Sequence, residues 1–220
     1  MIADHPLKLG FAMEGMEDRM GGIVRNVCVN FARPTYLEIG IGHGETLVGL
    51  STVFRDSSEH WRCVGIDLPN GYSLNKNACR DNAYRAGIRS ELQEGVTGKL
   101  MPKWNQITIV LQDAQQVLAE HWQEEISLAL IDGCHGKKCA TLEFLLLEPF
   151  VPKGGIVMFH DFGHDQIGQE QPHCKEGIDV RGACEDLGLL DNKRPGWKYQ
   201  MEIIGNKQQG SANMGVFQKV

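Results

Sequence analysis

The sequence predicts an α/β protein in which a doubly wound, mostly parallel sheet ends in an antiparallel hairpin. Short apolar runs alternate with helix-like segments at least four times, and the runs are apolar at successive positions rather than at every second one. Strands of that kind are buried on both faces, which is typical of a parallel sheet with helices on each side. Two strand-like segments near the end of the chain have only a polar loop between them, and this arrangement predicts the hairpin.

The composition is that of one globular domain. The chain has 220 residues, of which 42% are hydrophobic and 23% charged, so it is long enough to bury a sizeable core. It contains no repeat and no linker-like tract, and we expect a single domain over residues 1–220. The formal net charge of −6 disfavours a protein that mainly binds nucleic acid.

Membrane insertion and export are not expected. No run approaches the ~20 apolar residues that span a bilayer, and the N-terminus lacks the apolar centre of a signal peptide. The seven cysteines form no paired framework, which favours reduced thiols and a cytoplasmic location.

The elements of the first half follow from periodicity and turn residues. Apolar residues at helical spacing predict a first helix over 16–32, and a strongly apolar run ending in glycine predicts a strand over 35–40. Pro69-Asn70-Gly71 closes the second strand, and β-branched residues favour the third. Further helices are expected over 45–54, 75–88 and 114–122, and further strands over 62–67 and from Ile107 onward.

The second half continues the alternation and then breaks it. A fourth strand is expected over 126–132, an apolar helix over 140–150 that stops near Pro149, and a fifth strand over 156–161. The tail differs, because residues 197–205 and 214–220 both read as strands without a helix between them. These two segments form the predicted hairpin.

Residues 35–50 join a strand to a helix through a glycine-rich turn. An apolar run reaches Glu38, glycines follow at Gly40, Gly42 and Gly44, and a helical pattern then resumes. Glycine costs conformational entropy, so three glycines at alternate positions are not explained by packing alone. A strand, a glycine turn and a helix N-terminus together make a site for a polar ligand.

Every expected parallel strand carries an acid at or just after its carboxyl end. The residues are Glu38, Asp67, Asp113, Asp132 and Asp161, with His135 and His160 beside the last two. Ligands of open parallel sheets bind beyond the carboxyl ends of the strands, near the point where the strand order reverses. Charged groups would be costly in a packed crevice, so we expect an open and polar one.

Each residue also has a plainer interpretation. Acids after a strand often cap the next helix, as Asp113 would, and Asp67 before Pro69-Asn70-Gly71 fits a turn. A single histidine at position 135 or 160 is more often structural than catalytic. Five strand ends that all carry an acid, in order, are harder to explain by capping.

These motifs, taken in order over residues 35–161, resemble the class I S-adenosylmethionine-dependent methyltransferases, which have a Rossmann-like fold. The first motif, Glu38-Ile39-Gly40-Ile41-Gly42-His43-Gly44, fits the family's acid-x-Gly-x-Gly-x-Gly. Asp67 in VGIDLP and Asp113-Ala114 in LQDA follow in the family's order, as does the final hairpin. The resemblance divides the chain into a helical segment (1–34), a cofactor-binding core (35–161), a substrate-side loop or helix (162–196) and the hairpin (197–220).

The resemblance implies a role for each motif in binding S-adenosylmethionine. The glycines let the backbone approach the amino-acid part of the cofactor, whose carboxylate meets the helix start at Gly44. Glu38 lies where the family contacts the ammonium group, usually indirectly. Asp67 would accept from the ribose hydroxyls, and Asp113 from the adenine amino group. The backbone of Ala114 meets the ring edge, and Asp132 is assigned to the cofactor site as well.

The second half resembles small-molecule O-methyltransferases of the macrocin and catechol type. Relatives that use Mg²⁺ bind it through an acid ending strand four and an adjacent pair ending strand five. The matching positions here are Asp132 and His160-Asp161. His160 departs from the pattern, since those relatives carry an acid there and Mg²⁺ prefers oxygen. A softer divalent ion, or no metal, therefore stays open.

Two mechanisms follow for methylation of a hydroxyl group. A divalent cation held by Asp132 and Asp161 would lower the pKa of the acceptor hydroxyl. Alternatively, His135 or His160 would remove the proton as a general base, oriented by Asp132 or Asp161. The resemblance further implies a small-molecule acceptor, no nucleic-acid or membrane partner, and a homodimer, which is common among such enzymes.

Two segments are candidates for the substrate side. Residues 163–177 are polar and read as a substrate loop, where a zinc site is a further hypothesis. Its histidines and cysteine, His164, His173 and Cys174, are the candidate ligands, and Asp165 lies in the same segment. Residues 91–106 read as an insertion near the cofactor, and Trp104 covers a ligand there or serves as an ordinary core or surface aromatic.

Three other functions compete with this interpretation. A nicotinamide-dependent oxidoreductase would need glycine where Glu45 stands in the G-x-G-x-x-G fingerprint. A polyamine synthase would share the fold. A binding module without catalysis would not be expected to keep the glycine motif and Asp67. Amino-methylating relatives often carry an Asn-Pro-Pro-Tyr-like stretch where IDGCHG stands here.

Overall fold

A computed structural model describes residues 16–70, 75–163, 167–168, 177–205 and 213–220 of the chain. The strands are β1 (Thr35–Ile39), β2 (Arg62–Asp67), β3 (Ser90–Gln93), β4 (Ile107–Leu111), β5 (Leu128–Ile131), β6 (Ile156–Phe159), β7 (Trp197–Ile203) and β8 (Met214–Lys219). The helices are α1 (Glu17–Asn30), α2 (Glu45–Ser57), α3 (Lys76–Arg85), α4 (Ala114–Gln116), α5 (Lys137–Leu147) and α6 (Val180–Asp186). A π-helical turn, Val117–His121, continues α4, and a 3-10 turn, Glu148–Phe150, follows α5.

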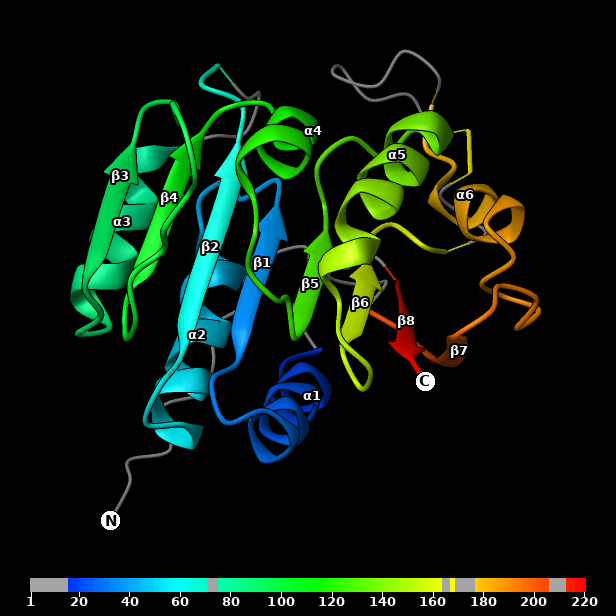
Figure 1. Cartoon of the computed structure of the whole chain (residues 1–220), viewed down its shortest axis with the longest axis horizontal. Coiled ribbons are helices and arrows are strands. Elements are labelled where there is room, and N and C mark those ends of the chain that lie inside the picture. Colours follow the sequence, from blue (N-terminus) through cyan, green and yellow to red (C-terminus); the bar gives the residue numbers. More distant parts are fainter. Residues whose placement is uncertain (1–15, 71–74, 164–166, 169–176, 206–212) are drawn as a thin grey trace.

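The eight strands form one sheet in the order β3-β4-β2-β1-β5-β6-β8-β7 (Figure 1). The first six pair in parallel, whereas β8 runs antiparallel to both β6 and β7. The predicted fold class, a doubly wound parallel sheet with an antiparallel C-terminal hairpin, is therefore confirmed. The strand order reverses at β1, which lies between β2 and β5, and this places a ligand crevice beyond its carboxyl end.

Helices cover both faces of the sheet. One core packs α1, α2 and α3 against side chains such as Tyr36 and Ile107, and the other packs α5 and α6 against Leu37 and Ile39. In Figure 1, α2 and α3 lie behind the sheet while α4 and α5 stand in front of it. Strands β1, β4, β5 and β6 are buried at every position, as their continuous apolar runs predict.

Strand β3 is an element that the sequence did not predict. The segment 91–106 was expected to be an insertion near the cofactor, but its first residues belong to β3, which pairs with β4 at the outer edge of the sheet. All four residues of β3 are only half-buried, so the strand lacks the apolar run that identifies an interior strand. In the part of the chain that the structure describes, no helix is long and apolar enough to cross a membrane.

Candidate functional site

A cavity of about 300 Å³ opens beyond the carboxyl ends of β1, β2, β4 and β5. Gly40, Asp67, Asp113, Ala114 and Asp132 all line it, so five of the residues expected to bind a cofactor share one space. A more voluminous hollow, of about 1020 Å³, lies between α3 and the β3 edge. None of the strand-tip acids lines that hollow, and we therefore place the site in the smaller cavity.

The glycine turn has the backbone that its sequence requires. Gly40, Gly42 and Gly44 all have positive φ values, of 82°, 48° and 73°. The turn is also tightly packed, because a Cβ atom on Gly40 would lie 2.3 Å from the carbonyl oxygen of Asp132. Gly44 is the N-cap of the 13-residue helix α2 and makes no side-chain cap, and a helix start of this kind favours an anion.

Asp67, at the end of β2, holds the glycine turn in place. Its Oδ2 accepts hydrogen bonds from the backbone N–H groups of Ile41 and Gly42, at 3.0 and 3.1 Å, and its Oδ1 accepts from Leu68 at 2.8 Å. Burial raises the pKa of this carboxyl group, against the opposing effect of these three backbone donors. Asp67 thus connects the turn to β2 while it lines the cavity.

Asp113 caps α4, as its plainer interpretation predicts. Its Oδ1 accepts from the backbone N–H groups of Gln115 and Gln116, at 2.8 and 3.1 Å. Asp113, Ala114 and Gln115 nevertheless all line the cavity. The cap therefore positions the start of α4 at the cavity wall.

Glu38 lies beneath the cavity rather than on its wall. The residue is 1% exposed, and its Oε2 accepts a hydrogen bond of 2.6 Å from the hydroxyl group of Tyr36. Burial raises the pKa of Glu38 well above its usual range, and the nearby carboxylates of Asp132 and Asp67 act in the same direction. Any effect of Glu38 on a ligand is consequently indirect.

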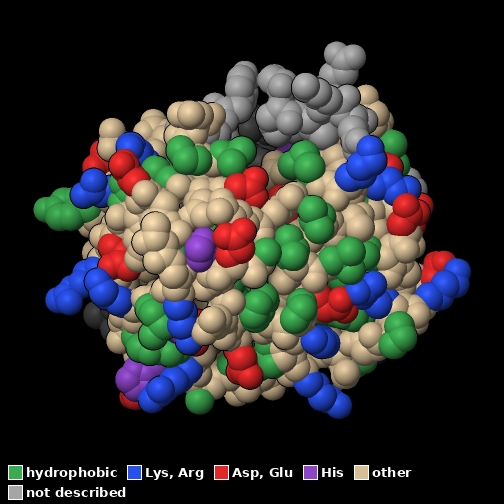
Figure 2. Space-filling model, turned by 45° about the horizontal axis from the view of Figure 1, so that its top comes forward, with side chains coloured by type: hydrophobic (Ala, Val, Ile, Leu, Met, Phe, Trp, Pro, Cys, Tyr) green, Lys and Arg blue, Asp and Glu red, His purple; other side chains and the backbone are tan. Residues whose placement is uncertain are grey.

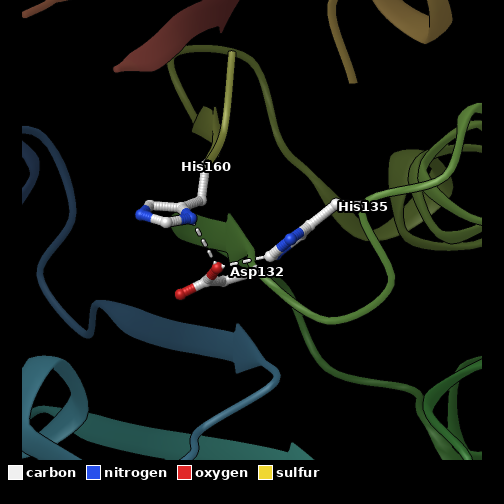
Figure 3. Close-up of side chains that lie close together, drawn as sticks. All are labelled: Asp132, His135 and His160. Atoms are coloured by element: carbon white, nitrogen blue, oxygen red, sulfur yellow. Dashed lines mark hydrogen bonds and ion pairs between the residues drawn. The ribbon is translucent and has the colours of Figure 1, made fainter. Parts of the chain in front are cut away.

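Two histidines and two aspartates meet at the ends of β5 and β6. Asp132 follows β5, His135 precedes α5, and His160 and Asp161 follow β6. Figure 3 shows the Asp132 carboxylate between the two imidazoles, with its Oδ1 3.0 Å from His135 Nε2 and 2.8 Å from His160 Nδ1. Asp161 Oδ2 lies 2.7 Å from the other ring nitrogen of His135, Nδ1.

The carboxylates of this cluster raise the pKa values of its histidines, and the imidazoles lower the pKa of Asp132. Burial alone would lower the pKa of His135, but hydrogen bonds to Asp132 and Asp161 outweigh it and raise the pKa from 6.5 to about 11. For His160 the attraction of Asp132 likewise overcomes burial and raises the pKa. Burial would raise the pKa of Asp132, yet the two imidazoles lower it. The cluster therefore favours the charged form of Asp132 and of both imidazoles.

His160 has an unused nitrogen. Its Nδ1 is within ion-pair distance of Asp132 but outside hydrogen-bond directionality, and its Nε2 is buried without a hydrogen-bond partner among the described residues. A buried polar atom without a partner usually marks strain, a ligand or a catalytic role. Asp161 adds local strain, because it is a non-glycine residue with φ of 54°.

The predicted metal ligands Asp132, His160 and Asp161 all lie in this cluster, and a second grouping of ligand atoms is also present. The structure groups one ligand atom each from Asp132, His135 and His160 within 4.8 Å of one another, whereas the sequence suggested Asp132, His160 and Asp161. Asp161 instead faces the two imidazoles. A set of one carboxylate and two imidazoles fits a first-row transition metal better than Mg²⁺.

Three expectations outside the cavity have different outcomes. Trp104 does not line it, because the Trp104 ring stacks 4.2 Å from the guanidinium of Arg62, which begins β2 at the opposite end of the sheet. The suggested zinc ligands His164, His173 and Cys174, and the neighbouring Asp165, lie outside the described residues. On the face shown in Figure 2, Lys and Arg side chains are scattered among acidic ones rather than gathered into a basic surface.

Sequence reasoning missed Glu143, which lines the cavity from α5. It is 5% exposed, and its Oε2 has no hydrogen-bond partner among the described residues. Burial raises its pKa from 4.5 to about 8. The helical periodicity of α5 was the available signal, because Glu143 occupies the buried stripe that Ala140, Phe144 and Leu147 define.

Comparisons with known proteins agree with this geometry. Residues 37–162 match the profile of a family described as a methyltransferase domain, whereas no curated protein matches the sequence. The fold resembles TomG from Streptomyces achromogenes, an O-methyltransferase of tomaymycin synthesis solved with SAM (TM-score 0.63, 14% identity, covering 93% of this chain and 79% of TomG). It also resembles an O-methyltransferase from Bacillus cereus solved with SAH (0.59, 15%, 92% and 81%) and the O-methyltransferase NovP (0.62, 13%, 93% and 79%).

Proposed function

Because the chain belongs to the family of methyltransferase domains, we propose that it transfers the methyl group of S-adenosylmethionine to a hydroxyl oxygen of a small molecule. The observation that carries this proposal is one continuous site, in which Asp132 belongs both to the cavity beside the glycine turn and to the histidine cluster. A site for a nucleoside and a site for proton removal thus share a residue. The structural neighbours with bound SAM or SAH support the choice of cofactor.

Each part of the cofactor is assigned to a different set of residues at the cavity. The glycine turn and the N-terminus of α2 take the amino-acid part, whose carboxylate suits the helix N-terminus. Asp67 lies beside the turn and accepts from a ribose hydroxyl with the Oδ1 lone pair that its three backbone donors leave free. Asp113, Ala114 and Gln115 form the wall beside the adenine. A pyrophosphate is not needed anywhere in this arrangement.

His160 is the group that removes the acceptor proton. S-adenosylmethionine, when bound, supplies a methyl group on a positively charged sulfur that an oxygen attacks in line. Asp132 holds the Nδ1 side of His160 and leaves its Nε2 for the proton of the acceptor hydroxyl. His135 is less suited, since both of its nitrogens lie within 3.0 Å of a carboxylate oxygen. His135 instead positions Asp132 and Asp161.

A divalent metal is the second route to the same reaction. Asp132, His135 and His160 would hold the ion, and it would supply Lewis acidity toward the acceptor hydroxyl. Binding would release the protons of the two imidazoles, so it would strengthen as the pH rises. The Nε2 of His160, which has no hydrogen-bond partner among the described residues, favours either route. The homodimer also stays a prediction, which light scattering tests.

Ligand binding tests the cofactor first. The full chain is titrated with SAM, SAH and NAD, each with and without Mn²⁺, Zn²⁺ or Mg²⁺, and its melting temperature is followed. A ligand at 100 times its dissociation constant stabilises by roughly 2.7 kcal/mol, which is about 5–10 °C for a domain of this size. Stabilisation by SAM and SAH but not NAD is expected, and a shift with NAD alone would refute the proposal. Release of SAH with a panel of small phenols, sugars and other alcohols then identifies the acceptor.

A further inference from the structure

We propose that the Glu143 carboxyl group reads the edge of the adenine base of the bound methyl donor. This inference rests on the proposed function, since it assigns a residue in the wall of the same cavity. Glu143 is an acidic residue on the core-facing stripe of α5, where its neighbours Ala140, Phe144 and Leu147 are apolar and buried. An acid in that position needs either a partner or a ligand.

The carboxyl group lies at the cavity wall. A Cβ atom added to Gly133, the residue after Asp132, would be 3.4 Å from Glu143 Oε1, so the absence of a side chain at Gly133 leaves room for the carboxyl group. Glu143 and Gly133 both line the cavity. The side chain is 5% exposed, and its Oε2 has no hydrogen-bond partner in the described part of the chain.

Glu143 lies where the adenine base of the cofactor would be, rather than its ribose or amino-acid part. Gly40, the first residue of the glycine turn, lines one side of the cavity, with Asp67 at the tip of the neighbouring strand β2. The next strand, β4, leads to Asp113 and the start of α4, and in Figure 1 α4 and α5 stand beside each other over the carboxyl ends of the strands. A nucleoside whose ribose meets Asp67 therefore directs its base between α4 and α5, toward Glu143.

The chemistry of the carboxyl group suits adenine. Its pKa of about 8 leaves it neutral at pH 7, because burial and the nearby carboxylates of Asp113 and Asp132 outweigh the opposing charge of His135. A neutral carboxyl group has one donor and one acceptor side by side. Adenine offers the complementary pair, an amino donor beside a ring nitrogen, and glutamine reads it in the same way.

Binding to a base analogue tests the inference. Calorimetry compares SAH with its 6-desamino analogue, which carries purine in place of adenine, in the wild type, Glu143→Gln and Glu143→Met. We expect the wild type and Glu143→Gln to prefer SAH by about tenfold or more, and Glu143→Met to bind both ligands equally. Glu125→Gln, which removes an exposed acid, is the matched control and should behave as the wild type.

The outcomes separate this inference from the proposed function. Failure of the wild type to bind SAH would overturn both. Binding with the same preference in Glu143→Met as in the wild type would overturn only the role of Glu143. If Glu143→Gln still melts cooperatively but no longer prefers SAH over the 6-desamino analogue, the role of Glu143 would likewise be overturned. Glu143→Leu provides a second apolar variant if Glu143→Met does not fold.

Discussion

Replacing Glu143 by glutamine should stabilise the protein at high pH and leave its stability nearly unchanged at low pH. The wild-type carboxyl group is buried, and its pKa is raised from 4.5 to about 8 in the folded state. The folded protein therefore holds a proton that the unfolded chain releases between these two values. Because the folded state binds more protons, the free energy of unfolding falls as the pH rises through this window. Glutamine cannot ionise, so the variant escapes this loss.

The magnitude follows from the shift itself. A pKa raised from 4.5 to about 8 corresponds to about 5 kcal/mol of unfolding free energy once the carboxyl group is fully ionised. The advantage of Glu143→Gln should be near zero at about pH 4, grow by roughly 1.4 kcal/mol per pH unit between the two pKa values, and level off above about pH 8. A constant offset from repacking of the amide changes the height of this curve and not its shape.

Urea unfolding at a series of pH values measures the effect. Titration of every other group cancels when the wild type is subtracted from the variant at each pH. Glu125→Gln, at an exposed position, supplies the control and should follow the wild type throughout. Unfolding free energies of wild type and Glu143→Gln that run parallel from pH 5 to about pH 9 would show that Glu143 ionises normally, and the reasoning from its burial would be wrong.

Three further predictions concern the cofactor and the cluster. Gly40→Ala should lower the free energy of unfolding in urea by about 1–3 kcal/mol, because Gly40 has a φ of 82° and a Cβ atom there would lie 2.3 Å from the carbonyl oxygen of Asp132. Gly22→Ala is the control and should not lower the free energy of unfolding, because the space around its Cβ is open. Asp67→Asn should weaken SAH binding about tenfold in calorimetry, since the single amide oxygen cannot replace both carboxylate oxygens, which accept from the turn and from Leu68; unchanged affinity would contradict its role. His160→Gln should lower kcat about 10²-fold or more, while its affinity for SAH stays within about threefold of the wild type. The kcat of the wild type should rise with pH above 6.5, because the raised pKa of His160 keeps the imidazole protonated below that value. A kcat that falls with rising pH would exclude His160 as the base.

The fold and the cofactor side of the site follow from local features of the sequence. Continuous apolar runs specify buried parallel strands, and glycine adopts the positive φ values found at Gly40, Gly42 and Gly44 without the strain that a side chain would add. The acid at the end of each strand is likewise brought to the site by the geometry of a parallel sheet, as Asp67 and Asp113 illustrate. Strand β3 escaped prediction because a half-buried edge strand has no apolar run.

The chemistry of the second half depends on tertiary packing. The sequence placed Asp132, His135, His160 and Asp161 at two strand ends, but it did not determine that Asp132 lies between both imidazoles or that Asp161 faces His135 instead of joining the group of ligand atoms. These pairings depend on side-chain directions from strands that are more than twenty residues apart in the chain.

Glu143 is the clearest case of a property that the sequence alone did not determine. Its helical position could be read from periodicity, but its raised pKa comes from burial against the cavity and from acids on other elements. A residue's environment is a property of the packed structure, because solvent exclusion and electrostatic neighbours arise only when distant segments meet. The sequence by itself therefore determined the sheet and the glycine turn, and the tertiary structure decided how burial and neighbouring charges shift the pKa of each acid and which histidine nitrogens lack a hydrogen-bond partner among the described residues.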